Sequence, residues 1–255
     1  MSHLFVLFLA STVLIPIALI YIAQWSPLAT WTRTLAVSPA TVSAVFLVFG
    51  LNLAFVSNEV WGTYDKARTA VASEGDTLRN LARMAQSIKA PIGRDILLAL
   101  QKYEAYTVQQ AWDLLAVGSW ETTEAGSLGQ LAVMVSSDEM SAATKPTVQS
   151  QLMTSVTTLR SLRNQRFALA SSGLNPMKWS FTCFLDIVAI FAIALANMEK
   201  RNQHIMASLL FFTASTPTIA LLVIEANPFA GMIPVSAQPI AIALDHVTAV
   251  LAQTQ

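Results

Sequence analysis

The stretch Ser38–Met84, SPATVSAVFLVFGLNLAFVSNEVWGTYDKARTAVASEGDTLRNLARM, decides the fold of this chain. Its first half is apolar enough to cross a bilayer, and its second half is charged and amphipathic, with no proline after position 39. Ser38 and Pro39 are typical of a helix start, with serine as the capping residue and proline at the first helical position. The pattern predicts one continuous helix that crosses a membrane and extends into a water-exposed helical domain.

An apolar ridge runs along the inner part of this span. Leu47, Leu51 and Phe55 recur every four residues, so they share one face of the helix. The ridge is open to two interpretations: ordinary helix packing, or a hydrophobic constriction that gates a pore by dewetting. Gly50 and Ala54 form a small-xxx-small pair on a different face, which suits close helix contact.

Polar residues accompany and follow the ridge. We interpret Asn52, Ser57 and Asn58 as candidates for a polar pore lining. The amide of Asn52 has two alternatives, a hydrogen bond to a neighbouring helix or exposure to water in a pore, and the sequence leaves both open.

The composition is that of a membrane protein. Of the 255 residues, 54% are hydrophobic and only 12% are charged, whereas soluble domains carry about 25% charged residues. The apolar residues gather in runs of about the ~20 residues that a helix needs to cross the hydrocarbon core. Four spans are predicted, at about 3–24, 40–57, 177–198 and 205–224.

The predicted fold class is an all-α membrane protein with four transmembrane helices and a large helical cytoplasmic domain inserted between spans two and three. The central domain shows helical apolar stripes and no strand pattern of convincing length. After the fourth span comes a tail that ends in a short apolar helix, Pro239–Leu251. The predicted parts are 1–57 with spans one and two, 58–176 as the helical domain, 177–225 with spans three and four, and 226–255 as the tail.

Orientation follows from the basic residues. Twelve of the fifteen Lys and Arg residues fall between Asn58 and Lys178. By the positive-inside rule the central domain and both termini are predicted to be cytoplasmic. Lys200 and Arg201, on the other side, go mildly against this orientation.

Charged residues give further candidate sites. Asp186 lies about mid-span, where a carboxylate is expensive, so either a function or a polar partner on a neighbouring span explains it. Glu225 lies at a span end, where exposure is cheap, so we interpret it as structural. A series of arginines predicts either a positive vestibule lining that attracts anions or a solvated helix face: Arg68, Arg79, Arg83, Arg160, Arg163 and Arg166.

Several classes of function are excluded or disfavoured. The sequence has no glycine-rich phosphate loop and no nucleophile–base pairing, so an enzyme is not expected, and no cofactor is predicted. The three histidines show no metal-ligand spacing, and Cys183 is the single cysteine, so no metal site is predicted. A formal net charge of zero gives no reason to expect nucleic-acid binding.

Three further segments of the sequence are distinctive: Trp61–Met84, with Ala70-Val-Ala-Ser-Glu-Gly-Asp-Thr-Leu-Arg79 inside it, Leu162-Arg-Asn-Gln-Arg166, and Glu225-Ala-Asn-Pro-Phe-Ala-Gly231. These segments resemble the bacterial bestrophin-like family. The overall plan of four spans and an inserted helical domain is also similar to that of bestrophins. In the last segment, the family-like tail element consists of Glu225, Asn227, Pro228, Phe229 and Gly231.

The resemblance implies an ion channel assembled as a homo-oligomeric ring, with a pentamer favoured, in the bacterial inner membrane. The second span would line the pore, with Phe55, Leu51 and Leu47 at the apolar neck. Small inorganic ions would pass down their gradient, with anions favoured over cations. Membrane lipid and further copies of the chain are the implied partners.

Two departures from the family pattern affect these expectations. Val56 stands where bacterial bestrophins tend to have Arg, which leaves charge selectivity open. Met232-Ile-Pro-Val-Ser-Ala237 stands where animal bestrophins carry their acidic calcium-binding cluster, so calcium gating is not expected. The main alternative function is a non-conducting accessory subunit of a larger membrane complex, and a third idea is a membrane sensor.

Overall fold

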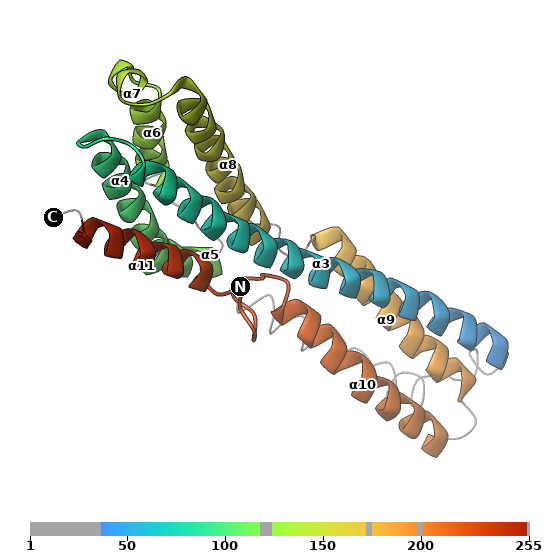
Figure 1. Ribbon diagram of the computed structural model, residues 1–255. Coiled ribbons are helices and arrows are strands. Elements are labelled where there is room, and N and C mark those ends of the chain that lie inside the picture. Colours follow the sequence, from blue (N-terminus) through green and yellow to red (C-terminus); the bar gives the residue numbers. More distant parts are fainter. Residues whose placement is uncertain (1–36, 118–123, 172–174, 198–200, 254–255) are drawn as a thin grey trace. The chain divides into compact units, whose positions relative to one another are not determined.

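The structure is a computed structural model that describes residues 37–117, 124–171, 175–197 and 201–253. The span predicted at 3–24 lies outside the described residues. The described chain is helical and contains no strand. Its helices are α3 (Pro39–Gln86), α4 (Ile92–Tyr106), the π-helical turn η1 (Thr107–Ala111), α5 (Trp112–Val117), α6 (Glu124–Val135), α7 (Asp138–Ala143), α8 (Pro146–Ser171), α9 (Pro176–Ala196), α10 (Arg201–Ile224) and α11 (Gln238–Gln253) (Figure 1).

The predicted continuous helix is confirmed as α3, a single helix of 48 residues. It begins at Pro39, and the Thr41 N–H donates to the Ser38 hydroxyl over 3.3 Å, so Ser38 caps the helix as predicted. The absence of an internal proline lets the helix run without a break.

The chain divides into two compact units. The span unit consists of Met1–Trp61 and Leu174–Ala226, and the helical unit consists of Gly62–Gly173 and Asn227–Gln255. The segment predicted as a separate tail therefore packs with the helical unit.

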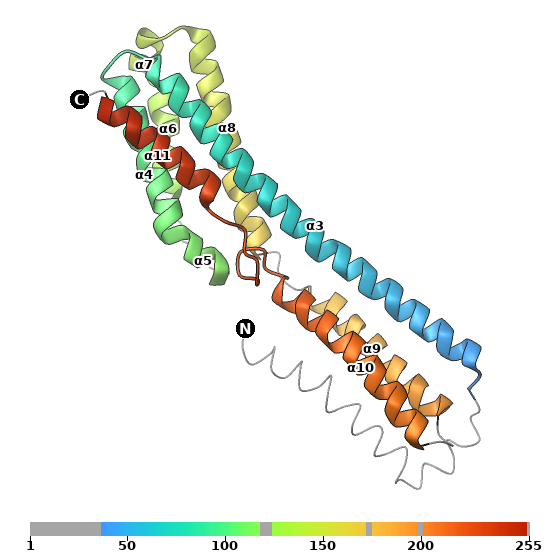
Figure 2. The same cartoon turned by 60° about the horizontal axis from the view of Figure 1, so that its bottom comes forward.

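Within the span unit, α9 and α10 lie side by side and run in opposite directions (Figures 1 and 2). The start of α9 is fixed by Asn175, whose side-chain oxygen accepts a hydrogen bond from the Met177 N–H over 3.0 Å. Three helical stretches of the described chain are long and apolar enough to cross a bilayer, and they include the first half of α3, α9 and α10. The core of the unit joins these helices through Phe49, Leu185, Ala189, Ile190, Ile193, Phe211 and Ile219.

The helical unit buries the apolar stripes that the sequence shows. Figures 1 and 2 show α11 beside α4, and Gln101 of α4 donates to the Thr248 hydroxyl of α11 over 3.1 Å. The residues that share the core are all at most 6% exposed: Leu78, Leu81, Ala85, Ile88, Ile96, Leu100, Tyr103, Leu152, Val156, Leu159, Ile240 and Val247. This burial of apolar surface is the main stabilising term of the unit.

Gly75 permits the closest approach inside the helical unit. A Cβ atom at this position would lie 2.5 Å from the carbonyl oxygen of Pro239, which is a clash with backbone. We expect Gly75→Ala to lower the free energy of unfolding by about 1–3 kcal/mol, because the start of α11 must move. Gly62→Ala is the matched control: nothing lies within 4 Å of a Cβ there, so it should stabilise α3 by about 0.5–1 kcal/mol. Thermal unfolding of the two variants checks this, and equal effects would contradict it.

Candidate functional site

The apolar ridge of α3 is exposed in the span unit. Leu47, Leu51 and Phe55 are 63%, 52% and 73% exposed. Large apolar side chains that are exposed in their own unit contact lipid, contact a second copy of the chain, or line an aqueous constriction.

The opposite face of the same helix holds the unit together. Phe49, Val56 and Val60 are at most 9% exposed. The Phe49 ring lies 5.5 Å from the Phe211 ring of α10, centroid to centroid. One face of α3 is thus used inside the chain, and the ridge face is left for contacts outside it.

Small residues flank the ridge. Gly50 and Ala54 are exposed, and a Cβ at Gly50 would meet no atom within 4 Å. The close packing that suits this pair is therefore not made by the described part of the chain. Small side chains beside a bulky ridge allow another helix to approach closely.

The polar candidates near the ridge differ in their placement. The Asn52 amide donates to the Thr182 hydroxyl of α9 over 2.9 Å, which is the neighbouring-helix alternative. The Ser57 hydroxyl donates to the Leu53 carbonyl of its own helix over 2.8 Å. Only Asn58 is exposed. The structure therefore turns the Asn52 amide toward α9 and satisfies the Ser57 donor within α3.

Asp186 has a polar partner on a neighbouring helix. It is 2% exposed, in the interior of α9, and its side chain forms a hydrogen bond with Ser215 of α10. Its Oδ1 atom makes no hydrogen bond within the described structure. Glu225, which we interpreted as structural because exposure is cheap at a span end, is in fact buried, with 4% of its surface exposed.

The arginine series does not form one lining. Arg160, Arg68 and Arg83 are exposed, but Arg163 is 9% exposed and Arg166 is fully buried. Both predicted alternatives, a vestibule lining and a solvated face, were therefore wrong for Arg163 and Arg166, because the α8 stripe turns these two side chains into the core.

Arg166 forms the centre of a buried polar network in the helical unit. Its guanidinium donates to both carboxylate oxygens of Glu74, over 3.0 and 3.2 Å. The Tyr103 hydroxyl donates to the same carboxylate over 2.5 Å. The guanidinium also lies over the Trp112 ring, 5.4 Å from its centroid. Helices α3, α4, α5 and α8 are joined by these contacts.

The tail element docks onto the same region of the helical unit. The Asn227 amide donates to the carbonyls of Leu115 and Ala116 over 3.2 and 3.3 Å, and its oxygen accepts from the Phe229 N–H over 3.0 Å. The Phe229 ring is buried and meets the Trp112 ring edge-on, with the centroids 5.6 Å apart. The Asn227 amide and the Phe229 ring of the tail element therefore make contacts that hold the fold together. Pro228 is buried and its carbonyl accepts the Val235 N–H over 2.9 Å, and Gly231 is half-buried.

Glu104 is a second buried carboxyl of the helical unit. It is fully buried in α4, and neither of its carboxyl oxygens has a hydrogen-bond partner in the described structure. Burial raises the pKa of Glu104 from 4.5 to about 8. At neutral pH the carboxyl is therefore protonated in the folded protein and ionised in the unfolded chain.

This difference makes the stability depend on pH. Because the folded state binds the extra proton, the free energy of unfolding should fall as pH rises from about 4.5 to about 8, by about 1.4 kcal/mol for each pH unit. Glu104→Gln should remove this slope and stabilise the protein most at the alkaline end. Thermal unfolding across this pH range tests it, with the exposed Asp65→Asn as control. Parallel pH curves for wild type and Glu104→Gln would contradict it.

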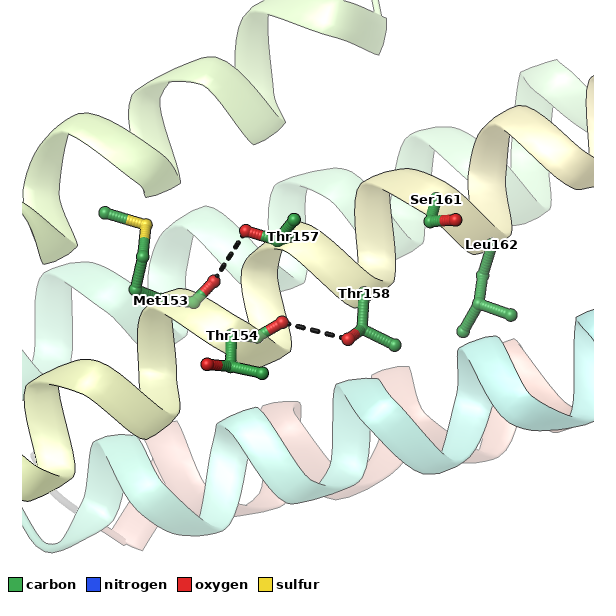
Figure 3. A pocket seen from close by; sticks show the side chains of 6 residues that line it. All are labelled: Met153, Thr154, Thr157, Thr158, Ser161 and Leu162. Carbon is green, nitrogen blue, oxygen red and sulfur yellow. Dashed lines mark hydrogen bonds between the residues drawn. The ribbon is translucent and has the colours of Figure 1, made fainter.

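A surface groove of about 410 Å³ lies along α8, lined by Met153, Thr154, Thr157, Thr158, Ser161 and Leu162 (Figure 3). The Thr157 and Thr158 hydroxyls donate to the carbonyls of Met153 and Thr154, each over 2.9 Å. These donors are satisfied within the helix and the lining carries no charge, so the groove offers little to an ion.

Neither the Glu74–Arg166 pair nor the burial of Glu104 was predicted from the sequence, although the sequence holds a signal for the pair. Extending the α3 stripe back from Leu78 places Glu74 at a core position, and extending the α8 stripe forward from Leu159 does the same for Arg166. A charged residue at a core position of a helical stripe predicts a buried partner.

The chain matches one protein-family model and is similar in fold to two solved structures. A family model of the bestrophin-like domain matches residues 9–240. The chain is similar to the crystal structure of a point variant of a bacterial bestrophin homolog from Klebsiella pneumoniae, with TM-score 0.71 and 11% identity, covering 97% of this chain and 98% of that one. It is also similar to the crystal structure of a membrane protein variant, with TM-score 0.66 and 13% identity, covering 98% of each chain.

No curated protein gives a significant match. The two solved structures are too distant in sequence to show more than the fold. The family model, however, spans most of the residues, including α3, α9, α10 and the tail element. The chain therefore belongs to the bestrophin-like family.

Proposed function

We propose that this protein is a subunit of a ring-shaped ion channel and that the ridge face of α3 lines the pore. The observation that carries the proposal is the exposure of Leu47, Leu51 and Phe55 at 63%, 52% and 73%, while the opposite face of α3 is packed inside the chain. Membership in a family of channels rather than enzymes supports the same reading.

The ridge suits a neck better than a lipid-facing surface, because of what lies beside it. Gly50 and Ala54 border the ridge and have open space above them. In a ring, the α3 helices of neighbouring copies would pack through these small residues. The bulky ridge would then face the axis, where a ring of apolar side chains holds water out when the pore is narrow.

The proposed topology has four spans, with the helical unit and both termini on the cytoplasmic side of the bacterial inner membrane. The clustering of twelve of the fifteen basic residues between Asn58 and Lys178 supports this orientation. A pentamer and a preference for anions follow the family resemblance. Val56, which stands at the family's arginine position, is buried at 8% exposure, so selectivity must come from other residues.

A different function would use the same surface. In a non-conducting accessory subunit, the ridge and its small neighbours would contact an unrelated membrane protein. Native mass spectrometry of the detergent-purified protein separates the two proposals. A closed ring of about five copies supports the channel, whereas a monomer, or a fixed complex with unrelated subunits, supports the accessory subunit.

A further inference from the structure

The buried face of α10 carries polar residues where a membrane helix usually carries apolar ones. His204, Ser208 and Ser215 are at most 5% exposed. They follow one another at intervals of four and seven residues, which places them on one side of the helix, one and two turns apart. The apolar members of the same stripe are Phe211, Ile219 and Leu222.

Helix α9 carries a matching series. Lys178, Thr182 and Asp186 recur every four residues on its length. The Asp186 side chain is hydrogen-bonded to Ser215 of α10. The Thr182 hydroxyl accepts a hydrogen bond from Asn52. The Lys178 ammonium lies 2.6 Å from a Glu59 carboxylate oxygen. Together these residues form a row of polar groups, the polar file, that leads from the exposed Lys178–Glu59 pair to the buried residues Asp186, Ser215, Ser208 and His204.

The two halves of this file differ in how many of their polar atoms have hydrogen-bond partners. On the Lys178 side, Lys178 forms an ion pair with Glu59, and Asn52 is hydrogen-bonded to Thr182. On the His204 side, three buried atoms have no hydrogen-bond partner among the described residues: Asp186 Oδ1, Ser208 Oγ and His204 Nε2. An unpartnered polar atom at membrane depth is costly, and water bridging to neighbouring polar groups removes that cost.

The charge of Asp186 also lacks a counter-ion nearby. On α3, the stretch from Pro39 to Asn58 carries no charged residue. On α9, Lys178 lies two turns away and is engaged with Glu59, and the Cys183 thiol, which interacts electrostatically with Asp186, supplies no positive charge. On α10, His204 lies about three turns from Ser215, and Arg201 and Glu225 lie at its ends. Among the described residues no cation is within reach, so a proton is the ligand that neutralises the carboxylate with the least change in packing.

We propose that the His204 half of this file is a hydrated half-channel that delivers protons to Asp186 from one side of the membrane. Protons enter at the His204 end of α10, pass through waters that bond Ser208, and bind the free Oδ1 of Asp186. The step forms one O–H bond on the carboxylate and leaves a neutral water behind. The Asn52–Thr182 pair closes the other side, so the site ends there and does not conduct protons through the membrane.

Waters have to bridge the section around Phe211. Ser208 and Ser215 are about 10 Å apart along the helix axis, which is more than one hydrogen bond can span. The Phe211 ring packs on α3, with its centroid 5.3 Å from that of Phe46. The buried face of α9 beyond Asp186 carries the small side chains of Ala189 and Ala192 next to the larger ones of Ile190 and Ile193.

Cysteine accessibility tests the hydration. In a Cys183→Ser background, Ser208→Cys and Ile219→Cys place a thiol on the same buried stripe, in the polar half and the apolar half. A membrane-impermeant, water-soluble methanethiosulfonate reagent is added to sealed vesicles sorted by orientation, and modification is followed by intact mass. Ser208→Cys should react at least about tenfold faster than Ile219→Cys, because thiolate forms readily only where water reaches. The reaction should occur only from the His204 side.

Equal rates for the two thiols, or equal reaction from both sides, would overturn the half-channel. Thr213→Cys is the matched control on the exposed face of α10, and purified variants are first checked for an unchanged oligomeric state. The readout uses no ionic current, so it separates this inference from the channel proposal: either can fail while the other stands.

The proton site has its own test. Dicyclohexylcarbodiimide modifies carboxyl groups that are protonated in an apolar setting, and peptide mass spectrometry locates the adduct. Modification of Asp186 should fall when the pH on the His204 side is raised, and should not respond to the pH on the other side. Asp186→Asn should abolish the adduct. Modification that follows the pH of the opposite side would contradict the proposed direction of access.

Discussion

Replacing Leu47, Leu51 and Phe55 together by alanine is expected to raise the single-channel conductance of the reconstituted protein. Each side chain contributes a bulky apolar group on the exposed face of α3. In a ring these groups repeat around the axis and keep a narrow neck dry. Truncation widens the neck and lets water in. If the dewetting barrier falls by about 1.4 kcal/mol, the current rises about tenfold.

The matched control truncates the same helix on its other face. Phe49, Val56 and Val60 are equally apolar but buried inside the span unit. The Val56→Ala and Val60→Ala changes should lower stability without raising conductance, because they open cavities in the core rather than the neck. Planar-bilayer recordings of both sets give the comparison. A triple ridge variant with unchanged conductance, despite intact assembly, would show that the ridge is not the neck.

Removing either partner of the Glu74–Arg166 pair is expected to destabilise the protein strongly. Both side chains are fully buried, and the carboxylate accepts from the guanidinium and from Tyr103. Arg166→Met leaves a buried carboxylate without its counter-ion, and Glu74→Gln does the same to the guanidinium. Breaking a buried ion pair in this way costs about 3–5 kcal/mol. The melting temperature should fall by about 10 °C for a chain of this size.

The controls isolate the pair from simple loss of bulk. Arg160→Met changes an exposed arginine on the same helix, and should alter stability by less than about 0.5 kcal/mol. The double variant Glu74→Gln/Arg166→Met contains no unpaired buried charge, so it should be less destabilised than the sum of the two single variants. Thermal unfolding followed by tryptophan fluorescence measures all four proteins. Additive losses in the double variant would argue against direct coupling.

Much of the fold follows from local patterns in the sequence. Ser38 and Pro39 define the start of α3 because a hydroxyl cap and a fixed φ favour a helix there. The stripe of Leu78, Leu81 and Ala85 is buried because residues at helical spacing share one face. These features depend on a few neighbouring residues, so the sequence predicts them.

Contacts between distant segments were less predictable. The burial of Arg166 depends on Glu74, which lies 92 residues away in the chain. The Asn52 amide is hydrogen-bonded to Thr182 of α9 rather than exposed to water, and only the tertiary structure brings these two residues together. The position of Glu225 at a span end did not indicate its burial, whereas the structure leaves only 4% of it exposed. Composition cannot show these partners, because the pairing is set by how helices meet.

Thiol block of the ionic current tests whether the ridge of α3 faces an ion-conducting pore. In a Cys183→Ser background, Leu51→Cys and Val56→Cys place a thiol on the exposed and buried faces of the same helix. A water-soluble, charged methanethiosulfonate is added during bilayer recording. The current through Leu51→Cys should change irreversibly, and the current through Val56→Cys should not. A current through Leu51→Cys that stays unchanged, although mass spectrometry shows the thiol modified, would contradict it.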